Sequence, residues 1–376
     1  MSNKNQIFNA IKTESDKFCR KILSMDEIYY EVLDLLKELI ATPSVSRDEC
    51  KAADMVERFL ASHGCVVERL GNNVYCKSAN FSPSKKTILL NSHIDTVKPV
   101  AGWTYPPFEA TEVEDRIYGL GSNDAGASLV SMIATFLILK DTEQSYNLIM
   151  LCSCEEEVSG KNGIESVIPY LPPISVAIVG EPTEMNPAVA EKGLMVLDGE
   201  VKGVSGHAAR NEGVNAIYLA LPIVERLSNL TFDKVSDYLG PVKISVTQIN
   251  AGTQHNVVPD LCRFVVDVRT TDAFTNEETL SLIRSAVPEC ELMPRSVRLR
   301  PSSIPMDHPI VQRLVFAGKQ PFGSPTLSDQ ALMPFPSVKC GPGNSARSHT
   351  ADEYITKTEI REAIQLYISI LDKLSI

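Results

Sequence analysis

The residues whose types could do chemistry lie in short polar segments, most of which follow apolar runs. They are His93 and Asp95 in NSHIDTV, Asp124 in GLGSNDAG, Glu156 and Glu157 in SCEEEVSG, Glu181 in VGEPTE, and His349 in NSARSHT. Histidines and carboxylates that bind two metal ions, together with one spare carboxylate as a base, are what a two-metal hydrolase requires. Each segment alone is a weak signal, but the whole set predicts a centre of this kind.

The segment TILLNSHIDTV shows how the first ligand is positioned. Residues 87–91 predict a buried strand, and His93 and Asp95 follow it two residues apart, so both side chains should project to one face of extended chain. A ligating imidazole usually donates its second ring N–H to a carboxylate. We therefore expect His93 to bind metal and Asp95 to orient it, although a plain hydrogen-bonded pair would also explain this spacing.

The remaining acidic segments have simpler interpretations too. Asp124 could be a helix N-cap, because it precedes the apolar stretch 125–140, yet a carboxylate is also the natural bridge between two cations. Glu155, Glu156 and Glu157 could form a solvated acidic loop. Without nearby cations such a cluster is costly, and neighbours in extended chain point to opposite sides, so we assign Glu157 to metal and Glu156 to water.

Apolar runs that end in a metal-capable group recur before Glu181 and His349. Strands of this type meet at the carboxyl edge of an open, mainly parallel α/β sheet, where such sheets build their sites. The sequence therefore predicts an α/β fold whose helices flank a mainly parallel sheet.

These segments resemble the group of di-metal amidohydrolases that contains zinc-dependent aminoacylases, acetylornithine deacetylases, succinyl-diaminopimelate desuccinylases and carboxypeptidases. The likeness runs from ATPSVSRDE, near residue 41, to the C-terminal helix. It implies that His93 and Glu181 bind one metal, that Asp124 bridges, and that Glu157 and His349 bind the second metal. It further implies that Glu156 is the general base and Asp95 the partner of His93.

The resemblance also suggests a substrate. Glu181 in GEPT is similar to the deacetylase and desuccinylase branch, and EKGLM and SGHAARNEG resemble acetylornithine deacetylases most. The expected reaction is hydrolysis of N-acetyl-L-ornithine to L-ornithine and acetate in arginine biosynthesis. N-succinyl-ornithine, N-acetyl-lysine and succinyl-diaminopimelate remain open, as do a dipeptidase, a carboxypeptidase and a metal-binding regulator without catalysis. Ala125, Gly126 and Ala127 depart from the family's Met-Lys-Gly, and Glu155 replaces an aspartate, but neither departure removes a ligand.

The middle of the chain predicts a second domain. From residue 191 the pattern runs strand (193–203), helix (214–230), strand (242–252), strand (261–271), helix (276–287) and strand (296–300). This β-α-β-β-α-β order is ferredoxin-like and interrupts the series of ligands. We expect a discontinuous catalytic domain of residues 1–184 and 298–376, with residues 185–297 as an inserted lid and dimerisation domain.

Three residues of this insert match functional positions of the family. His207 is expected at the start of a helix and, by resemblance, reaches into the partner subunit's active site to polarise the scissile carbonyl of the amide. Asn256 and Arg269 match substrate-binding positions. A capping histidine, a turn residue and a strand ion pair are the respective structural alternatives.

Composition limits the partners. A formal net charge of −11 without a basic stripe disfavours nucleic acid, and the N-terminal segment lacks a long apolar core, while other apolar runs fall short of a membrane span. Nine cysteines without a Cys-x-x-Cys pair suggest a cytoplasmic protein with reduced thiols, and Cys152 and Cys154 suggest buried packing. Mixed histidine and carboxylate ligands favour two Zn²⁺ ions, although Co²⁺ or Mn²⁺ could substitute. We expect a homodimer that acts on a small N-acyl amino acid.

Overall fold

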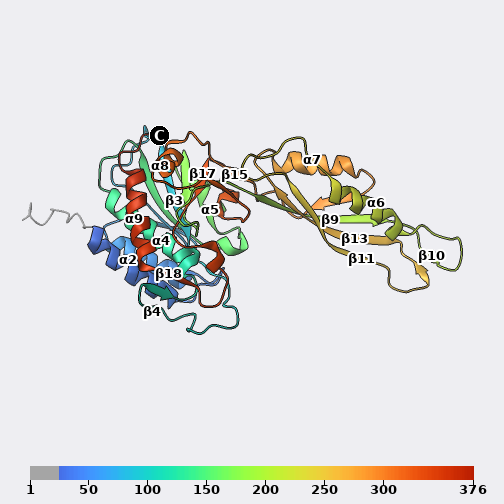
Figure 1. Cartoon of the computed structure of the whole chain (residues 1–376), viewed down its shortest axis with the longest axis horizontal. Coiled ribbons are helices and arrows are strands. Elements are labelled where there is room, and N and C mark those ends of the chain that lie inside the picture. Colours follow the sequence, from blue (N-terminus) through green and yellow to red (C-terminus); the bar gives the residue numbers. More distant parts are fainter. Residues whose placement is uncertain (1–24) are drawn as a thin grey trace, which may run out of the picture.

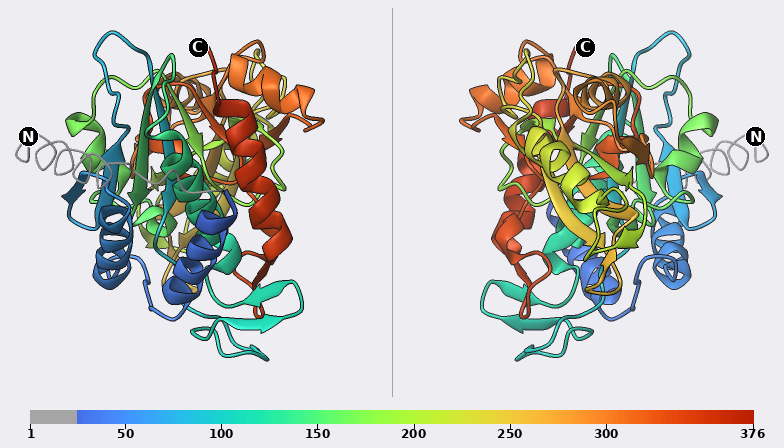
Figure 2. Two further views of the ribbon diagram at one scale, coloured as in Figure 1. Left: turned by 90° about the vertical axis from the view of Figure 1, so that its left-hand side faces the viewer. Right: turned by 90° about the vertical axis from the view of Figure 1, so that its right-hand side faces the viewer.

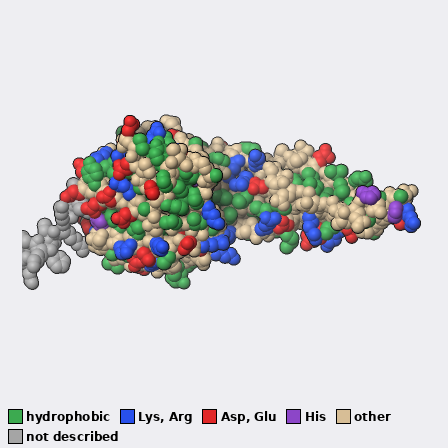
Figure 3. Space-filling view, turned by 90° about the horizontal axis from the view of Figure 1, so that it is seen from below, with side chains coloured by type: hydrophobic (Ala, Val, Ile, Leu, Met, Phe, Trp, Pro, Cys, Tyr) green, Lys and Arg blue, Asp and Glu red, His purple; other side chains and the backbone are tan. Residues whose placement is uncertain are grey.

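The computed structural model describes residues 25–376. The expectations for the N-terminal segment concern residues that lie outside this range, as does the start of the predicted catalytic domain. The described chain forms a broad core and a narrower insert that projects from one side of it (Figure 1). Seen from below, acidic and basic side chains are interspersed over both parts (Figure 3).

The core is organised around a nine-stranded sheet. Its central strands β6, β3, β7 and β17 are mutually parallel, and antiparallel strands extend it on both sides. In spatial order the strands are β1 (Val67–Leu70), β2 (Asn73–Lys77), β6 (Asn147–Ser153), β3 (Thr87–His93), β7 (Val176–Val179), β17 (Ser337–Lys339), β8 (Ala188–Glu191) and β15 (Ser302–Ser303), with β16 (Phe322–Ser324) beside β8. The predicted α/β fold with a mainly parallel sheet is confirmed.

Helices cover both faces of this sheet, which explains why β3 and β6 are buried along their whole length. One face carries α2 (Met25–Ile40), α3 (Cys50–Ser62), α4 (Ala127–Leu139), α8 (Pro309–Phe316) and α9 (Lys357–Leu371). Figure 2 shows α2, α4 and α9 side by side in front of the sheet. The short helix α5 (Ile164–Val167) packs on the opposite face.

Helix α4 is apolar all round because it lies between the sheet and its neighbouring helices. The stretch Ser122–Leu139 has a mean hydropathy of 1.3 and is long and apolar enough to cross a membrane, but 83% of it is buried inside the fold. The expectation that every apolar run falls short of a span is therefore wrong for this stretch by length and composition. Its burial identifies it as the central helix of a globular core.

The insert contains a four-stranded antiparallel sheet in the order β11-β13-β9-β14. Its elements are β9 (Gly193–Lys202), α6 (Ala216–Asn229), β11 (Lys243–Ala251), β13 (Leu261–Thr270), α7 (Asn276–Ala286) and β14 (Glu291–Pro294), with a small pair of strands, β10 (Gly206–His207) and β12 (Val257–Val258). This is the predicted β-α-β-β-α-β order. Helices α6 and α7 bury one face of the sheet in a separate hydrophobic core.

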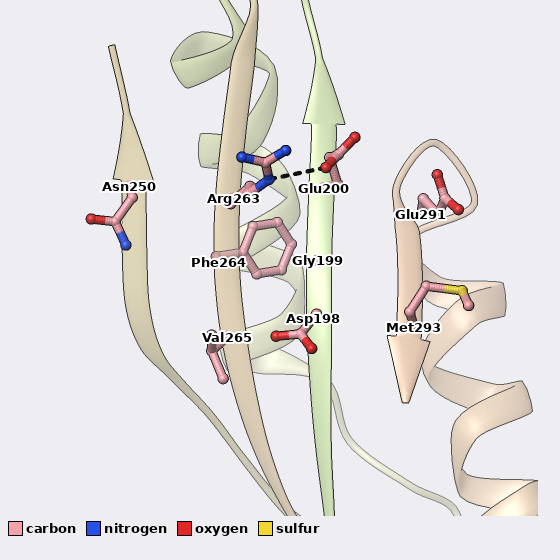
Figure 4. A pocket seen from close by; sticks show the side chains of 9 residues that line it. All are labelled: Asp198, Gly199, Glu200, Asn250, Arg263, Phe264, Val265, Glu291 and Met293. Carbon is pink, nitrogen blue, oxygen red and sulfur yellow. Dashed lines mark hydrogen bonds and ion pairs between the residues drawn. The ribbon is translucent and has the colours of Figure 1, made fainter. Parts of the chain in front are cut away.

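The other face of the insert sheet is open. A shallow hollow there is lined by residues from all four strands, and two of its charged side chains, Arg263 and Glu200, form an ion pair at 3.1 Å (Figure 4). None of the predicted site residues lines this hollow.

The junction between the two parts differs in detail from the predicted limits of 185 and 297. Strand β8 belongs to the large sheet, so the chain leaves that sheet at Glu191 and returns to it at Ser302. The strand expected at 296–300 is not formed, because the strand that completes the insert sheet is β14, with Pro294 at the sheet edge where proline is tolerated. Residues 298–300 instead connect the insert to the core.

A three-stranded sheet of β4 (Thr111–Val113), β5 (Arg116–Tyr118) and β18 (Tyr354–Thr356) lies beside the start of α4. Strand β18 connects the segment that contains His349 to α9. This small sheet therefore links the end of the chain to the turn that carries Asp124.

Candidate metal centre

The ends of the parallel strands bring the predicted ligands together. His93 is the last residue of β3, while Glu156 and Glu157 follow β6, and Glu181 follows β7. Because these strands run in the same direction, all four side chains emerge at one edge of the sheet. Asp124 reaches the same place from the turn Ser122–Gly126 that precedes α4.

His93 lies at the centre of this cluster. Its Nε2 atom is 3.3 Å from Asp124 Oδ1, 3.7 Å from Glu181 Oε1 and 4.0 Å from Glu156 Oε2. Two groups of three side chains are close enough to hold a metal ion: His93 with Glu156 and Glu181, and His93 with Asp124 and Glu157. Glu156, the predicted base, is thus within reach of the same ion as Glu181.

His349 completes the cluster from the other side. Its Nε2 atom lies 3.1 Å from Glu157 Oε2 and 3.6 Å from Asp124 Oδ2. Asp124 therefore has one oxygen directed at each histidine, which is the arrangement that a bridging carboxylate needs. The His349 side chain is about half exposed, so this side of the centre is open to solvent.

The electrostatics of the cluster favour cations. Burial raises the pKa of Glu181 to about 8, and burial raises the pKa of Glu156 well above its ordinary value despite the nearby charge of His93. Burial also opposes the charged form of Asp124, but its hydrogen bond with His93 holds its pKa below the ordinary value. Several buried carboxylates in one place are costly unless positive charge compensates them, so this donor set fits two divalent ions.

Asp95 does more than orient the imidazole. His93 Nδ1 is 2.9 Å from the backbone carbonyl oxygen of Asp95 and 3.5 Å from its carboxylate. The two carboxylate oxygens accept hydrogen bonds from the backbone N–H groups of Glu156 and Glu157, each at 3.1 Å, and a further one from Ser46 Oγ at 2.7 Å. One buried carboxylate thus holds the turn that carries both glutamates.

The third acidic neighbour points elsewhere. Glu155 is 6% exposed and has a φ of 55°. Its carboxylate accepts a hydrogen bond from the Asn162 side chain at 2.9 Å, so it closes the loop after β6 and stays away from the metal-capable groups. Cys152 and Cys154, also near this strand end, are buried free thiols whose pKa values are raised by burial, as expected for packing residues.

The predicted site residues of the insert lie in two other places. His207 is in the short strand β10 at the end of the insert that is remote from the core (Figure 1), and Asn256 lies beside it, its carbonyl oxygen accepting from the N–H of Ala208 at 3.0 Å. The expectation that His207 starts a helix is wrong, because α6 begins only at Ala216. Arg269 lies near the junction with the core and pairs with Asp267 at 2.9 Å.

Several buried or partly buried polar residues near the centre were not predicted from the sequence. Ser46 contacts Asp95, Glu353 accepts hydrogen bonds from the turn of Asp124, and Lys339 forms a buried ion pair of 2.6 Å with Glu191. A lysine or glutamate that ends or precedes a strand is common in any protein. The only available signal was the position of Glu353 soon after His349 in the sequence.

Clustered histidines and carboxylates at the carboxyl edge of such a sheet define a metal-dependent amidohydrolase. A model of peptidase family M20/M25/M40 matches residues 89–373. The chain belongs to this family, which confirms the resemblance seen in its motifs.

Curated relatives include both deacylase types. Acetylornithine deacetylase of Aliivibrio fischeri is 27% identical, and the match covers 92% of this chain and 97% of the relative. Succinyl-diaminopimelate desuccinylase of Paracoccus denitrificans is 28% identical over 272 residues, which cover 67% of this chain and 70% of the relative.

Solved structures share the fold. An aminopeptidase from Bacillus cereus superposes with a TM-score of 0.74 at 17% identity and covers 94% of this chain and 99% of its own. A dinuclear metal binding peptidase from Bacillus subtilis gives a TM-score of 0.71, also at 17% identity, and covers 92% and 99%.

Proposed function

We propose that this protein hydrolyses the amide bond of an N-acyl amino acid at a centre of two divalent metal ions. The observation that carries the proposal is the position of Asp124 between the two histidines, 3.3 Å from His93 and 3.6 Å from His349. In the proposed centre His93 and Glu181 hold one ion, Glu157 and His349 hold the other, and Asp124 bridges them.

The donor set favours zinc. Two imidazoles and three carboxylates match the nitrogen and oxygen ligands of catalytic zinc sites, while cobalt and manganese accept the same groups. Two such ions would polarise the amide carbonyl and lower the pKa of a water molecule.

The remaining steps belong to the protein's own side chains. Glu156 is proposed as the general base, which takes a proton from the attacking water and returns it to the leaving amine. Burial, which raises the pKa of Glu156, suits a carboxylate that must hold a proton during the reaction. Asp95 is proposed to fix His93 and the backbone of Glu156 and Glu157, which holds the general base and the metal ligands in constant relative positions.

We propose N-acetyl-L-ornithine as the substrate, with L-ornithine and acetate as products, a reaction of arginine biosynthesis. Two facts support it. Relatives named acetylornithine deacetylase align along 91–92% of this chain and 97–98% of their own length, whereas the match to the Paracoccus desuccinylase covers 67% of this chain.

A charged cluster in the insert favours a second candidate, succinyl-diaminopimelate. Lys243 is the cross-strand partner of Arg269, and Lys192 lies near enough for the charges of both to lower its pKa, although burial is the larger cause. Among the described ion pairs, Asp267 is the one carboxylate that neutralises this cluster. Excess positive charge suits a substrate with several carboxylates better than ornithine, whose side chain is a cation.

The deciding experiment is a substrate panel on zinc-loaded protein. It compares N-acetyl-L-ornithine, N-succinyl-L-ornithine, N-acetyl-L-lysine, N-succinyl-diaminopimelate and simple dipeptides by kcat/KM. We expect the acetyl amino acids to exceed the dipeptides, and N-acetyl-L-ornithine to rank first. A preference of tenfold or more for the succinyl substrates would transfer the assignment to the second candidate, and turnover of dipeptides alone would overturn the deacylase proposal.

We further propose that the protein is a cytoplasmic homodimer assembled through the insert. Strand β11 is an edge of its sheet with unpaired backbone groups, and α6 beside it exposes Tyr218, Leu219 and Leu221. Two copies that pair along β11 and α6 would bury both features. All eight described cysteines are free thiols, which suits a reducing compartment.

In such a dimer the two insert residues remote from the core would have a role. His207 is proposed to donate to the carbonyl oxygen of a substrate in the partner's site, with Asn256 and Arg269 as substrate-binding residues. Its Nδ1 atom accepts from the N–H of Ala209 at 3.1 Å, which leaves Nε2 protonated and able to donate.

A further inference from the structure

We propose that Glu353 is a positioning residue for the metal centre, because its carboxylate fixes the turn that delivers Asp124. Glu353 is only 2% exposed, and its carboxylate accepts three hydrogen bonds from a single turn. Oε1 accepts hydrogen bonds from the N–H groups of Asn123 at 2.8 Å and Asp124 at 2.9 Å, and Oε2 accepts one from Gly121 at 3.1 Å. The inference rests on the proposed metal centre.

The turn needs an acceptor of this kind. Residues 121–124 lie between β5 and α4, where Asp124 has a non-helical backbone, with φ −120° and ψ 99°, so its N–H is not satisfied within a regular helix. Buried N–H groups without partners are costly. One carboxylate supplies both oxygens to three of them, which ties the direction of the Asp124 side chain to the position of Glu353.

Glu353 also connects the two sides of the centre. It follows His349 closely in the chain, and its own carbonyl oxygen accepts from the N–H of Gly119 at 3.0 Å. Asn123 adds further links, since its side chain bonds to the backbone N–H and carbonyl of Asn344, each at 3.1 Å, and to Ser348 Oγ at 3.2 Å. The segment that carries His349 is therefore joined directly to the turn that carries Asp124.

Glu353 itself is not among the side chains close enough to hold an ion. Its effect on metal must therefore pass through Asp124 and His349, the two groups that lie 3.6 Å apart. Outer residues that orient ligands in this way typically change metal affinity by about 10–100-fold. A carboxylate that only stabilised the fold would change stability and leave metal affinity alone.

The test uses Glu353→Gln and Glu353→Ala in the full-length protein. Glutamine keeps the length and one acceptor oxygen, but it presents an amide N–H to at least one of the three backbone donors, whereas alanine removes every acceptor. Zinc affinity is measured by competition with a chromophoric chelator, and the number of ions per chain by elemental analysis. We expect affinity to fall about tenfold in the glutamine variant and further in the alanine variant.

Glu359→Gln is the matched control. Glu359 is a partly buried carboxylate of the same region, and it accepts hydrogen bonds from Thr356 and Arg347 but from no N–H group of the Asp124 turn. It should lower thermal stability while zinc affinity stays at the wild-type value. If a Glu353 variant folds only with metal, the rate at which a chelator strips the loaded protein gives the same comparison.

Two results would overturn the inference. Wild-type zinc affinity in both Glu353 variants, with a loss of stability like that of the control, would make Glu353 a purely structural residue while the metal centre stands. A wild-type protein that binds no zinc, cobalt or manganese would remove the centre itself and the inference with it.

Discussion

Glu156 and Glu157 are neighbours in the chain, yet their surroundings differ. Glu157 contacts His349 through both carboxylate oxygens, at 3.1 and 3.2 Å, whereas the histidine near Glu156 is His93, at 4.0 Å. Their backbone N–H groups are held by the two oxygens of the same aspartate, Asp95. Because both backbone positions are fixed, two adjacent residues can take the separate roles of general base and metal ligand.

The corresponding prediction compares Glu156→Gln with Glu157→Gln. The first variant should bind two ions normally and lose turnover by about 10²–10⁴-fold, because only proton transfer is removed. The second should lose the ion on the His349 side. Metal content and kcat, measured on the same samples, decide the matter, and equal metal loss in both would make Glu156 a ligand.

A second prediction at this scale concerns pH and metal loading. In the metal-free protein the hydrogen bond with Glu157 raises the pKa of His349 from 6.5 to about 9. At pH 7 the imidazole is therefore protonated, and a metal ion must displace that proton. Apparent zinc affinity should rise as pH increases from 6 to about 9 and then level off. Calorimetry in two buffers of different ionisation enthalpy should detect proton release at pH 7, and its absence would contradict the prediction.

The same shift has a definite sign for the stability of the metal-free protein. A raised histidine pKa stabilises the folded state fully below the unfolded value of 6.5, and that contribution is lost as pH rises through about 9. Because the side chain is half exposed, the contribution is small.

At the scale of elements, the two hydrophobic cores are separate. Phe264 of β13 is 2% exposed in the insert core, and Phe136 of α4, the helix that follows the Asp124 turn, is fully buried in the main core. The metal-capable residues all belong to the same part of the chain as Phe136, the main core. Substitutions in the two cores should therefore differ in their effect on metal binding.

We expect Phe264→Ala to destabilise the insert by about 3–5 kcal/mol and to leave the number of bound ions per chain unchanged. Phe136→Ala should cost a similar amount and also reduce metal binding. Scanning calorimetry with and without zinc, combined with metal analysis, checks both. Loss of metal in the Phe264 variant would show that the insert is needed to form the centre.

The elements also show what sequence reasoning can reach. The strands that lead to His93 and Glu181 were predictable because an apolar run followed by a polar group is a local pattern. The contacts of Asp95 with Glu156 and of Glu353 with Asn123 were not, since they join segments far apart in the chain and depend on backbone N–H groups that carry no sequence signal. The helix expected at His207 failed for a local reason: a hydrogen-bonded turn at residues 207–210 and the strand pairing of Gly206 and His207 replace it.

At the scale of the whole molecule, His207 lies in β10 at the end of the insert remote from the core, whereas the metal-capable residues belong to the core (Figure 1). A catalytic role for His207 therefore requires a second copy. An acyl-transfer site without its oxyanion donor loses about 10²–10³ in turnover, so His207→Ala should be nearly inactive with both metals retained.

Mixing that variant with Glu156→Gln tests the arrangement in a dimer. A heterodimer of the two would contain one site with both groups intact, so subunit exchange should restore part of the activity. The control is mass spectrometry of the intact dimers in the same mixture, which detects the heterodimer whether or not it is active. Persistent inactivity of the variant mixture despite exchange would contradict action between subunits.

The junction of the insert has a consequence for how this chain can change. Strands β8 and β15 are antiparallel neighbours with Glu191 opposite Ser302, so residues 192–301 leave and re-enter the core at adjacent points. To the core sheet, the whole insert is topologically one hairpin loop. The entropy of closing a loop grows only with the logarithm of its length. Evolution could therefore lengthen, trim or exchange this loop, and with it the proposed partner surface and the proposed substrate contacts, while the core sheet keeps its shape.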